Sequence, residues 1–308
     1  MAFVDLMRRA ADSDIWYSFK SSHVVVVATV VTLFIFAMAF LAPILAPHTP
    51  FDPATLSLSD ALKPPVLTGE DGADWAFPLG TDEQGRDVLS SIMYGTRLSL
   101  VVGILATIFS MVLGIALGLI SGYVGGGVDA FIMRLADVQL TFPALLVALL
   151  IDGVVRGLIS VQRHDEIALY VIIGAIGLSF WVQYARTVRG SVLVEKSKEY
   201  VQAARVIGLS PVLIMIRHVL PNVMGPVLVI ATINIGLAVL TEATLSFLGV
   251  GLPSTQPSLG TLIRLGQEVL LSGTWWIVIF PGVTLAILVV AVNLMGDWLR
   301  DALNPKLR

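Results

Sequence analysis

The sequence contains no cysteine and few charged residues. Without cysteine, disulfides, cysteine-ligated zinc and thiol catalysis are all excluded. Only 13% of the 308 residues are charged, whereas 56% are hydrophobic; soluble domains usually have about 25% charged residues. So few charges cannot cover a water-facing surface. The composition therefore predicts a membrane protein with several spans, and the net charge of -3 gives no sign of a nucleic-acid partner.

Common catalytic and nucleotide-binding motifs are also missing from the sequence. There is no G-x-x-x-x-G-K-[ST] phosphate loop, no H-E-x-x-H zinc motif and no G-x-S-x-G elbow. We therefore expect a chain that is not an enzyme, that holds no cofactor or metal of its own and that does not bind ATP through a phosphate loop. The four histidines are scattered, at His23, His48, His164 and His218.

Six long apolar segments can each cross a membrane as a helix. Crossing the hydrocarbon layer takes about 20 predominantly apolar residues in a helix. The first segment is too long for the core of a signal peptide and has no convincing cleavage site, so we expect an uncleaved anchor. The pattern predicts an all-α, polytopic membrane protein with six transmembrane helices, at residues 24–46, 98–122, 130–151, 167–185, 222–246 and 275–296.

The distribution of lysine and arginine predicts how these spans are oriented. With the N-terminus inside, 13 of the 19 basic residues lie on the inner side, and an excess of positive charge marks the cytoplasmic side. Both termini are therefore predicted to be cytoplasmic. The layout begins with a cytoplasmic N-terminal segment (residues 1–23), a first helix (24–46) and an external loop (47–97). A five-helix core (98–296), which contains a cytoplasmic loop at 186–221, and a cytoplasmic tail (297–308) follow.

Small residues recur at every fourth position of the second span, at Ser110, Gly114, Gly118 and Gly122. On a helix this spacing makes one stripe of small side chains, which lets a neighbouring backbone approach closely. We expect tight helix packing there rather than contact with a solute. The glycine-rich stretch that follows, Gly122–Asp129, predicts a tight cytoplasmic turn.

A few polar side chains lie within or near the spans. Arg134 and Asp137 are three residues apart in the third span, where they can partly neutralise each other on one helix face, and a structural pair is favoured over an ion path. Asn234, Glu242 and Gln267 lie in or near later spans. They can line a solute path or form hydrogen bonds between helices, and the sequence leaves both interpretations open.

The loop at 186–221 differs from the rest of the chain because it carries six basic residues and two acidic residues. Residues 201–207 predict a short helix that Gly208 ends. Ser210 and Pro211 predict the start of a second short helix, and Pro221 marks the entry to the fifth span. Two short helices that meet at a glycine predict a compact docking element. The alternative is a basic loop that only fixes the topology.

This loop resembles the EAA loop of bacterial ABC-importer permeases, E-A-A-x3-G-x9-I-x-L-P. In that family the loop inserts into a cleft of a cytoplasmic ATPase subunit, and two small alanines would let the helix enter such a cleft. Gln202 stands at the position of the usual glutamate and His218 at that of the usual isoleucine. The residues that match the motif are Ala203, Ala204, Gly208, Leu220 and Pro221. Together with Gln202 they form the predicted ATPase-coupling site.

Four further blocks resemble the second permease of dipeptide and oligopeptide importers, a subfamily that usually has tryptophan where Leu259 stands. The resemblance implies a type I ABC-importer permease fold in the bacterial inner membrane. It also implies a homologous second permease, two ATPase subunits that bind ATP and magnesium, and an extracytoplasmic solute-binding protein as partners. The blocks are LGTDEQGRDVLSSIMYGTRLSL (residues 79–100), GYVGGGVDAFIMRLAD (122–137), TEATLSFLGVGLPSTQPSLGTLI (241–263) and NLMGDWLRDALNPKLR (293–308).

The resemblance implies a peptide as the transported solute. Nickel, glutathione and opine importers share the same blocks, so these solutes stay open. The sequence does not identify the residues that contact the solute or the role of the external loop. Alternatives from other classes are a membrane enzyme or sensor subunit that uses the external loop, which would need a reactive constellation, and a passive channel, which would have no use for the docking element.

Overall fold

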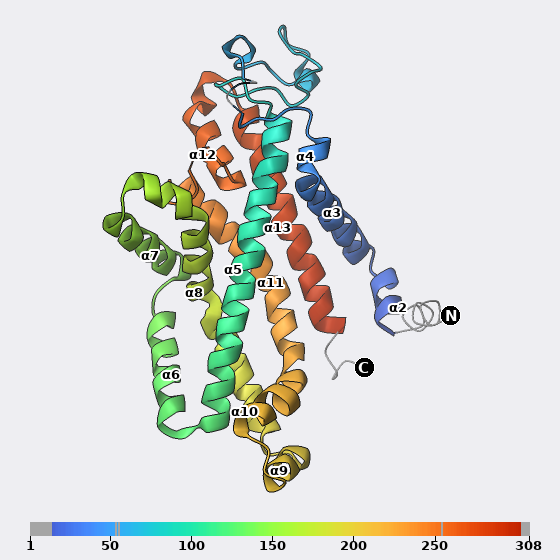
Figure 1. Ribbon diagram of the computed structural model, residues 1–308. Helices are drawn as coiled ribbons and strands as arrows, with labels where there is room; N and C mark the ends of the chain where they lie inside the picture. The colour runs from blue at the N-terminus through green and yellow to red at the C-terminus, as the bar shows by residue number, and fades with distance from the viewer. Residues whose placement is uncertain (1–13, 53, 55, 254, 303–308) are drawn as a thin grey trace.

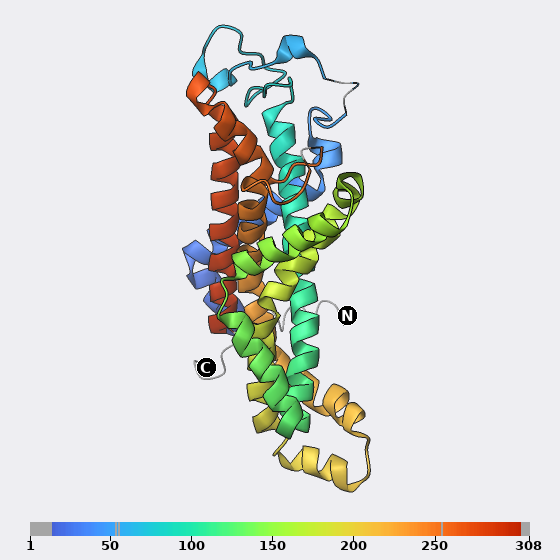
Figure 2. The same ribbon diagram turned by 90° about the vertical axis from the view of Figure 1, so that its left-hand side faces the viewer.

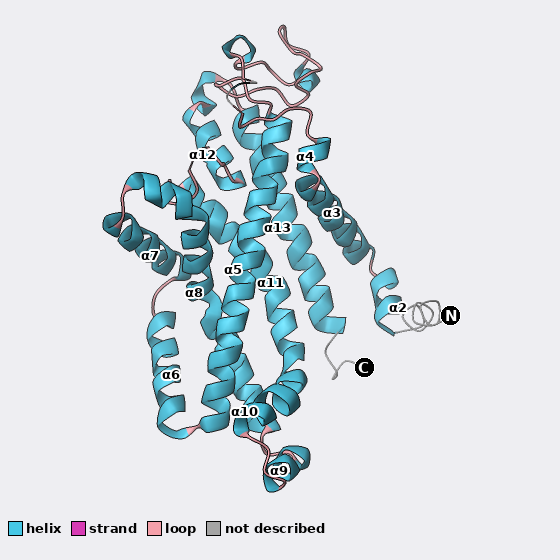
Figure 3. Cartoon of the chain, viewed as in Figure 1, coloured by secondary structure: helices cyan, strands magenta, loops and turns pink. Residues whose placement is uncertain are grey.

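The computed structural model describes residues 14–52, 54, 56–253 and 255–302. This part of the chain consists of helices joined by turns and loops, and it contains no β-strand (Figures 1 and 3). The α-helices are α2 (Asp14–Ser21), α3 (His23–Phe40), α4 (Ala42–Leu45), α5 (Val88–Val124), α6 (Gly126–Leu140), α7 (Ala144–Leu158), α8 (Val161–Glu195), α9 (Glu199–Val206), α10 (Pro211–Ile214), α11 (Leu220–Phe247), α12 (Leu259–Glu268) and α13 (Trp276–Ala302). Short helical turns are η2 (Leu58–Asp60), η3 (Val66–Thr68), η4 (Met215–Val219) and η5 (Leu270–Ser272).

Five helices in the described residues are long and apolar enough to cross a membrane, and the α6–α7 pair makes a sixth span if it is counted as one. The all-α fold predicted from the sequence is therefore confirmed. A single continuous helix over residues 130–151 is wrong, because α6 and α7 are bent by 94° at the break between them. Pro143 explains the bend: proline disfavours a helical conformation of the residue before it, here Phe142.

The two longest helices, α5 and α8, form the central pair of the bundle. With 37 and 35 residues they are about 55 and 52 Å long at 1.5 Å per residue, whereas the hydrocarbon core is about 30 Å thick. Both helices therefore extend beyond the membrane. Helix α5 begins ten residues before the predicted span because the Asp87 carboxylate caps it, accepting hydrogen bonds from the backbone N–H groups of Leu89 and Ser90 at 3.3 and 3.0 Å.

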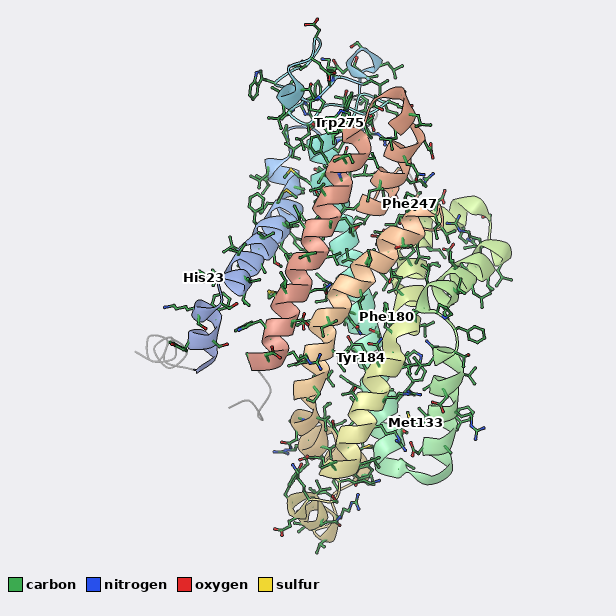
Figure 4. All side chains as sticks on the ribbon, turned by 180° about the vertical axis from the view of Figure 1, so that it is seen from behind. His23, Met133, Phe180, Tyr184, Phe247 and Trp275 are labelled. Carbon is green, nitrogen blue, oxygen red and sulfur yellow. The ribbon has the colours of Figure 1, made fainter. Side chains whose placement is uncertain are left out.

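The stripe of small residues on α5 packs against α8, as its spacing predicted. A Cβ atom added at Gly114 would lie 2.4 Å from Cβ of Tyr184, and one at Gly118 would lie 2.6 Å from the carbonyl oxygen of Ala185. Tyr184 is fully buried on the inner face of α8 (Figure 4). Larger side chains on this stripe would therefore force the two helices apart.

Buried polar groups serve contacts between helices. The Glu242 carboxylate of α11 accepts hydrogen bonds from Ser99 of α5 and Ser246 of α11, both at 2.7 Å. For Glu242, the interpretation as a helix-packing residue is therefore confirmed. Asp137 of α6 forms its ion pair with Arg186 of α8; the predicted pairing with Arg134 is wrong because the long α8 side chain reaches across the helix interface.

The segment between α4 and α5, residues 46–87, covers one end of the bundle (Figure 2). Contacts to the ends of two helices hold it there. The His48 backbone N–H donates to Ser90 Oγ of α5 at 3.1 Å, and the Trp276 indole of α13 donates to the Thr81 carbonyl at 3.1 Å. Within the segment, the His48 ring stacks on Phe77 with 4.9 Å between ring centroids.

Candidate functional site

The candidate site is the element between α8 and α11, which projects from the end of the bundle opposite the 46–87 segment (Figure 1). We call residues 199–219, comprising α9, the following turn, α10 and η4, the knob. Its connection to α8 is the short stretch 196–198. Because α8 extends beyond the length needed to cross the hydrocarbon, the knob lies at the tip of a rigid stalk.

The turn of the knob follows from Gly208. Its φ of 82° is in the left-handed region, which costs other residues about 1–2 kcal/mol. The Gly208 N–H donates to the Arg205 carbonyl at 3.0 Å and the Leu209 N–H to the Ala204 carbonyl at 3.1 Å, the pattern of a Schellman motif. The prediction that Gly208 ends the first helix is confirmed.

The second helix of the knob starts at Ser210 and Pro211, as predicted, and leads into α11 near Leu220. The Ser210 side chain accepts a hydrogen bond from the Leu213 N–H at 3.4 Å, and Pro211 occupies the first turn. The helix then continues through the π-helical turn η4 directly into α11. The prediction that Pro221 marks the entry to the fifth span is confirmed, because Pro221 lies in the first turn of α11, which begins at Leu220.

Helix α9 has one face turned to the chain's own core and one face turned outward. Ala204 is 3% exposed and Val201 is fully buried, and both belong to an apolar cluster with Val192 of α8. Gln202 and Ala203 are exposed. The expectation that both alanines face a partner is therefore wrong for Ala204, whose small side chain lets α9 pack on its own stalk; only Ala203 of the pair faces outward.

Polar contacts fix the base of the knob. Glu195, 6% exposed, accepts a hydrogen bond from the Tyr200 hydroxyl and pairs with Lys198 Nζ at 2.8 Å. The Asn222 side chain donates to the Tyr200 oxygen at 3.1 Å. Partial burial, followed by the hydrogen bond to Glu195, raises the pKa of Tyr200 to about 12, so the phenol remains a donor at neutral pH.

Two further contacts connect the knob and its stalk to the end of α5. The Arg205 guanidinium lies over the Tyr123 ring, 5.0 Å from the centroid, and the Lys196 ammonium donates to the Gly122 carbonyl at 2.7 Å. Sequence reasoning missed Tyr200 and Tyr123. The available signal was the position of Tyr200 within the basic loop and of Tyr123 within the glycine-rich stretch Gly122–Asp129, in a chain with six tyrosines.

Apolar side chains are exposed at the tip of the knob. Val206 is 87% exposed and Ile207 74%. They flank the turn at Gly208 and lie beside the exposed Gln202 and Ala203. The structure thus brings four of the six predicted coupling residues to the α9 side, with Ala204 facing inward, while Leu220 and Pro221 lie at the foot of α11.

The knob carries exposed apolar and basic side chains on its outer surface. In the described part of the chain, no group of three or more histidine, aspartate or glutamate side chains could hold a metal ion. The knob instead combines basic side chains with an exposed apolar tip on a capped, positioned element. The exposed Val206 and Ile207 give this tip an apolar surface that a partner protein can contact.

Comparison with known proteins identifies the class to which this fold belongs. The family described as "Binding-protein-dependent transport system inner membrane component" matches residues 114–308, and the "N-terminal TM domain of oligopeptide transport permease C" matches residues 13–65. A structure of the MetNI methionine ABC transporter in inward facing conformations has the same fold, with a TM-score of 0.54 and 20% identity over 70% of this chain and 96% of that chain.

Curated relatives are similar over nearly the whole chain. The dipeptide transport system permease protein DppC of Bacillus subtilis (strain 168) is 37% identical over 96% of this chain and 86% of its own length. DppC of Escherichia coli (strain K12) is 39% identical over 96% and 93%. The oligopeptide transport system permease protein OppC of Bacillus subtilis (strain 168) is 35% identical over 96% and 90%.

The chain therefore belongs to the family of binding-protein-dependent transport system inner membrane components: it is a multi-pass permease subunit of an ABC importer. Within that family it is of the DppC/OppC-like type. The resemblance inferred from the EAA-like loop and the four sequence blocks is confirmed.

Proposed function

We propose that this permease subunit carries peptides across the inner membrane in a complex with a homologous permease, two ABC ATPase subunits and an extracytoplasmic binding protein. The observation that supports the proposal most is the knob, a basic, capped element with an exposed apolar tip formed by Val206 and Ile207. A passive channel has no use for such an element, whereas an ATP-driven importer needs a surface on which its ATPase can act.

The peptide class rests on the relatives that match most of the chain. They are named as dipeptide, di/tripeptide and oligopeptide transport permeases, from several bacteria and at 35–39% identity over 295–299 residues. The same family type contains importers of nickel, glutathione and opines according to the sequence resemblance. A peptide is nevertheless the solute that the relatives support.

The proposed orientation places the knob and both termini in the cytoplasm. The excess of basic residues on the knob side supports it, and helix α2 and the last turn of α13 both lie away from the 46–87 segment (Figure 1). Movement of the ATPases would push the knob, and the stalk of α8 would carry the movement into the bundle as a rigid-body rotation.

Catalysis is assigned to the partners. ATP and magnesium would bind to the ATPase subunits, because the sequence has no phosphate loop. The knob would take part in the transport cycle only by contacting the ATPase, without a chemical step of its own. Its contact residues are the outward-facing Gln202 and Ala203, together with the turn at Gly208.

Reconstitution tests this function. We expect proteoliposomes with both permeases, both ATPases and the binding protein to import labelled dialanine only when ATP is supplied. The purified chain alone should hydrolyse no ATP above background. ATP-dependent uptake of nickel ions or glutathione without uptake of any dipeptide or oligopeptide would contradict the peptide assignment, and ATP turnover by the isolated chain would contradict the assignment of catalysis to the partners.

A further inference from the structure

A cavity of about 330 Å³ lies on the side of the bundle away from the knob, between α5, the start of the 46–87 segment and the loop that connects α11 to α12. Tyr94 and Arg97 of α5 face it, together with Phe51, Thr255 and Gln256 from the two loops. We call it the Arg97 pocket. Under the proposed orientation its lining residues on α5 belong to the outward half of that helix, on the side from which a solute would arrive.

Arg97 is the chemically distinctive group of this pocket. Its side chain is exposed, and no ion pair or hydrogen bond holds its guanidinium within the described part of the chain. Arg156, Arg186 and Arg189 of neighbouring helices, by contrast, each pair with an aspartate. A guanidinium carries a permanent positive charge and five N–H donors in a planar fork, so an arginine in a pocket suits an anionic ligand.

The walls of the pocket complement this charge. Phe51 and Tyr94 meet edge to face, with 6.0 Å between their centroids and an interplanar angle of 86°. The Arg86 guanidinium also lies over the Phe51 ring, 5.6 Å from its centroid. Thr255 and Gln256, which carry a hydroxyl and an amide, also line the pocket. Aromatic walls accept many different side chains, while the amide and hydroxyl can pair with a peptide group.

We propose that the Arg97 pocket binds the terminal carboxylate of the peptide solute as it enters the permease. Arginine is suited to this because its planar guanidinium donates two parallel hydrogen bonds to one carboxylate. The volume is near the lower end of the roughly 300–1,000 Å³ range of ligand pockets, which matches the end of a peptide rather than a long chain. This inference rests on the proposed peptide import and adds the feature of the solute that this chain recognises.

A single-cysteine protection experiment tests the inference in the assembled complex. The chain has no cysteine, so Thr255→Cys introduces one thiol at the edge of the pocket, and the label on this subunit is read by mass. We expect dialanine to slow the reaction of this thiol with a maleimide, and dialanine amide, which lacks the carboxylate, to leave the rate unchanged. Arg97→Gln should weaken the protection by dialanine at least about tenfold, as expected when a hydrogen bond to a charged group is lost.

Arg163→Gln, made in the Thr255→Cys chain, is the matched control, because Arg163 is an exposed arginine that does not line the pocket. In this variant dialanine should protect the thiol as well as it does in the chain with Thr255→Cys alone. Equal protection by the amide, unchanged protection in Arg97→Gln, or no protection at any dialanine concentration would each overturn the inference. Dialanine uptake by the unsubstituted complex is measured in parallel. If the complex takes up dialanine but dialanine does not protect the thiol, only this inference is contradicted. If the complex takes up no peptide at all, the proposed function is contradicted.

Discussion

The absence of a side chain matters at three glycines of this molecule, at two for helix packing and at one for backbone conformation. The α5–α8 contact tolerates no Cβ atom at Gly114 or Gly118, which lets the two long helices approach closely in lipid, where apolar surface alone gives no drive for association. At the knob, Gly208 adopts a φ that other residues reach only with strain. Both roles could be predicted from the sequence, because a four-residue glycine repeat and a glycine between two short helices each have one physical meaning.

The buried stripe gives a prediction about stability. Gly118→Ala places a methyl group 2.6 Å from the Ala185 carbonyl oxygen and 2.8 Å from Cβ of Val188, so we expect a loss of about 1–3 kcal/mol, as overpacking costs. Gly174→Ala in α8 meets nothing within 4 Å and should leave stability equal or raise it by about 0.5–1 kcal/mol, the gain from alanine in a helix.

The measurement is the thermal unfolding midpoint of the purified subunit in detergent, monitored by circular dichroism. A lower midpoint for Gly118→Ala than for Gly174→Ala supports the packing. Equal midpoints for the two variants would mean that α5 and α8 are not in close contact through this stripe.

At the scale of elements, most helices could be predicted from apolar length, and the departures have local causes. The third span is broken because Pro143 disfavours a helical Phe142. The knob's second helix runs into α11 through the π-helical turn η4, which ends two residues before Pro221. The inward face of α9 could not be predicted, because it depends on how an eight-residue helix lies against the end of α8, and Ala203 and Ala204 are indistinguishable in the sequence.

The two alanines therefore make a matched pair for testing the placement of α9. Ala204→Trp puts a large ring into a position that is 3% exposed, so it should displace α9 from the stalk and increase amide hydrogen exchange throughout residues 199–206. Ala203→Trp lies on the exposed face and should leave exchange in α9 close to that of the unsubstituted chain. The measurement is hydrogen exchange of the purified subunit in detergent, followed by mass spectrometry. Equal exchange in both variants would show that α9 is not packed through Ala204.

At the scale of the whole molecule, the two candidate sites lie at opposite ends of one helix. Helix α5 carries Arg97 toward the 46–87 segment and Tyr123, which lies under Arg205 of the knob, at its other end. A rigid helix of 37 residues is suited to couple movement at the knob to the shape of the pocket. The Arg97 pocket could not be predicted from the sequence, since Phe51 and Gln256 come together only through loops far apart in the chain.

The central claim, that the knob transmits the action of the ATPases, is tested most directly by the ATP hydrolysis that the loaded binding protein stimulates in proteoliposomes containing the complete complex. Ala203→Trp should abolish this stimulated part and dialanine uptake together, because the added ring blocks the outward face of α9 without disturbing its inner face. Ser197→Ala, in the connection before the knob, should be nearly silent, since its hydroxyl only donates to the Val194 carbonyl of the preceding turn. Subunit stoichiometry is checked by mass for each variant. Normal stimulated hydrolysis and normal uptake in Ala203→Trp would contradict the account and would leave the knob as a basic loop that only fixes topology.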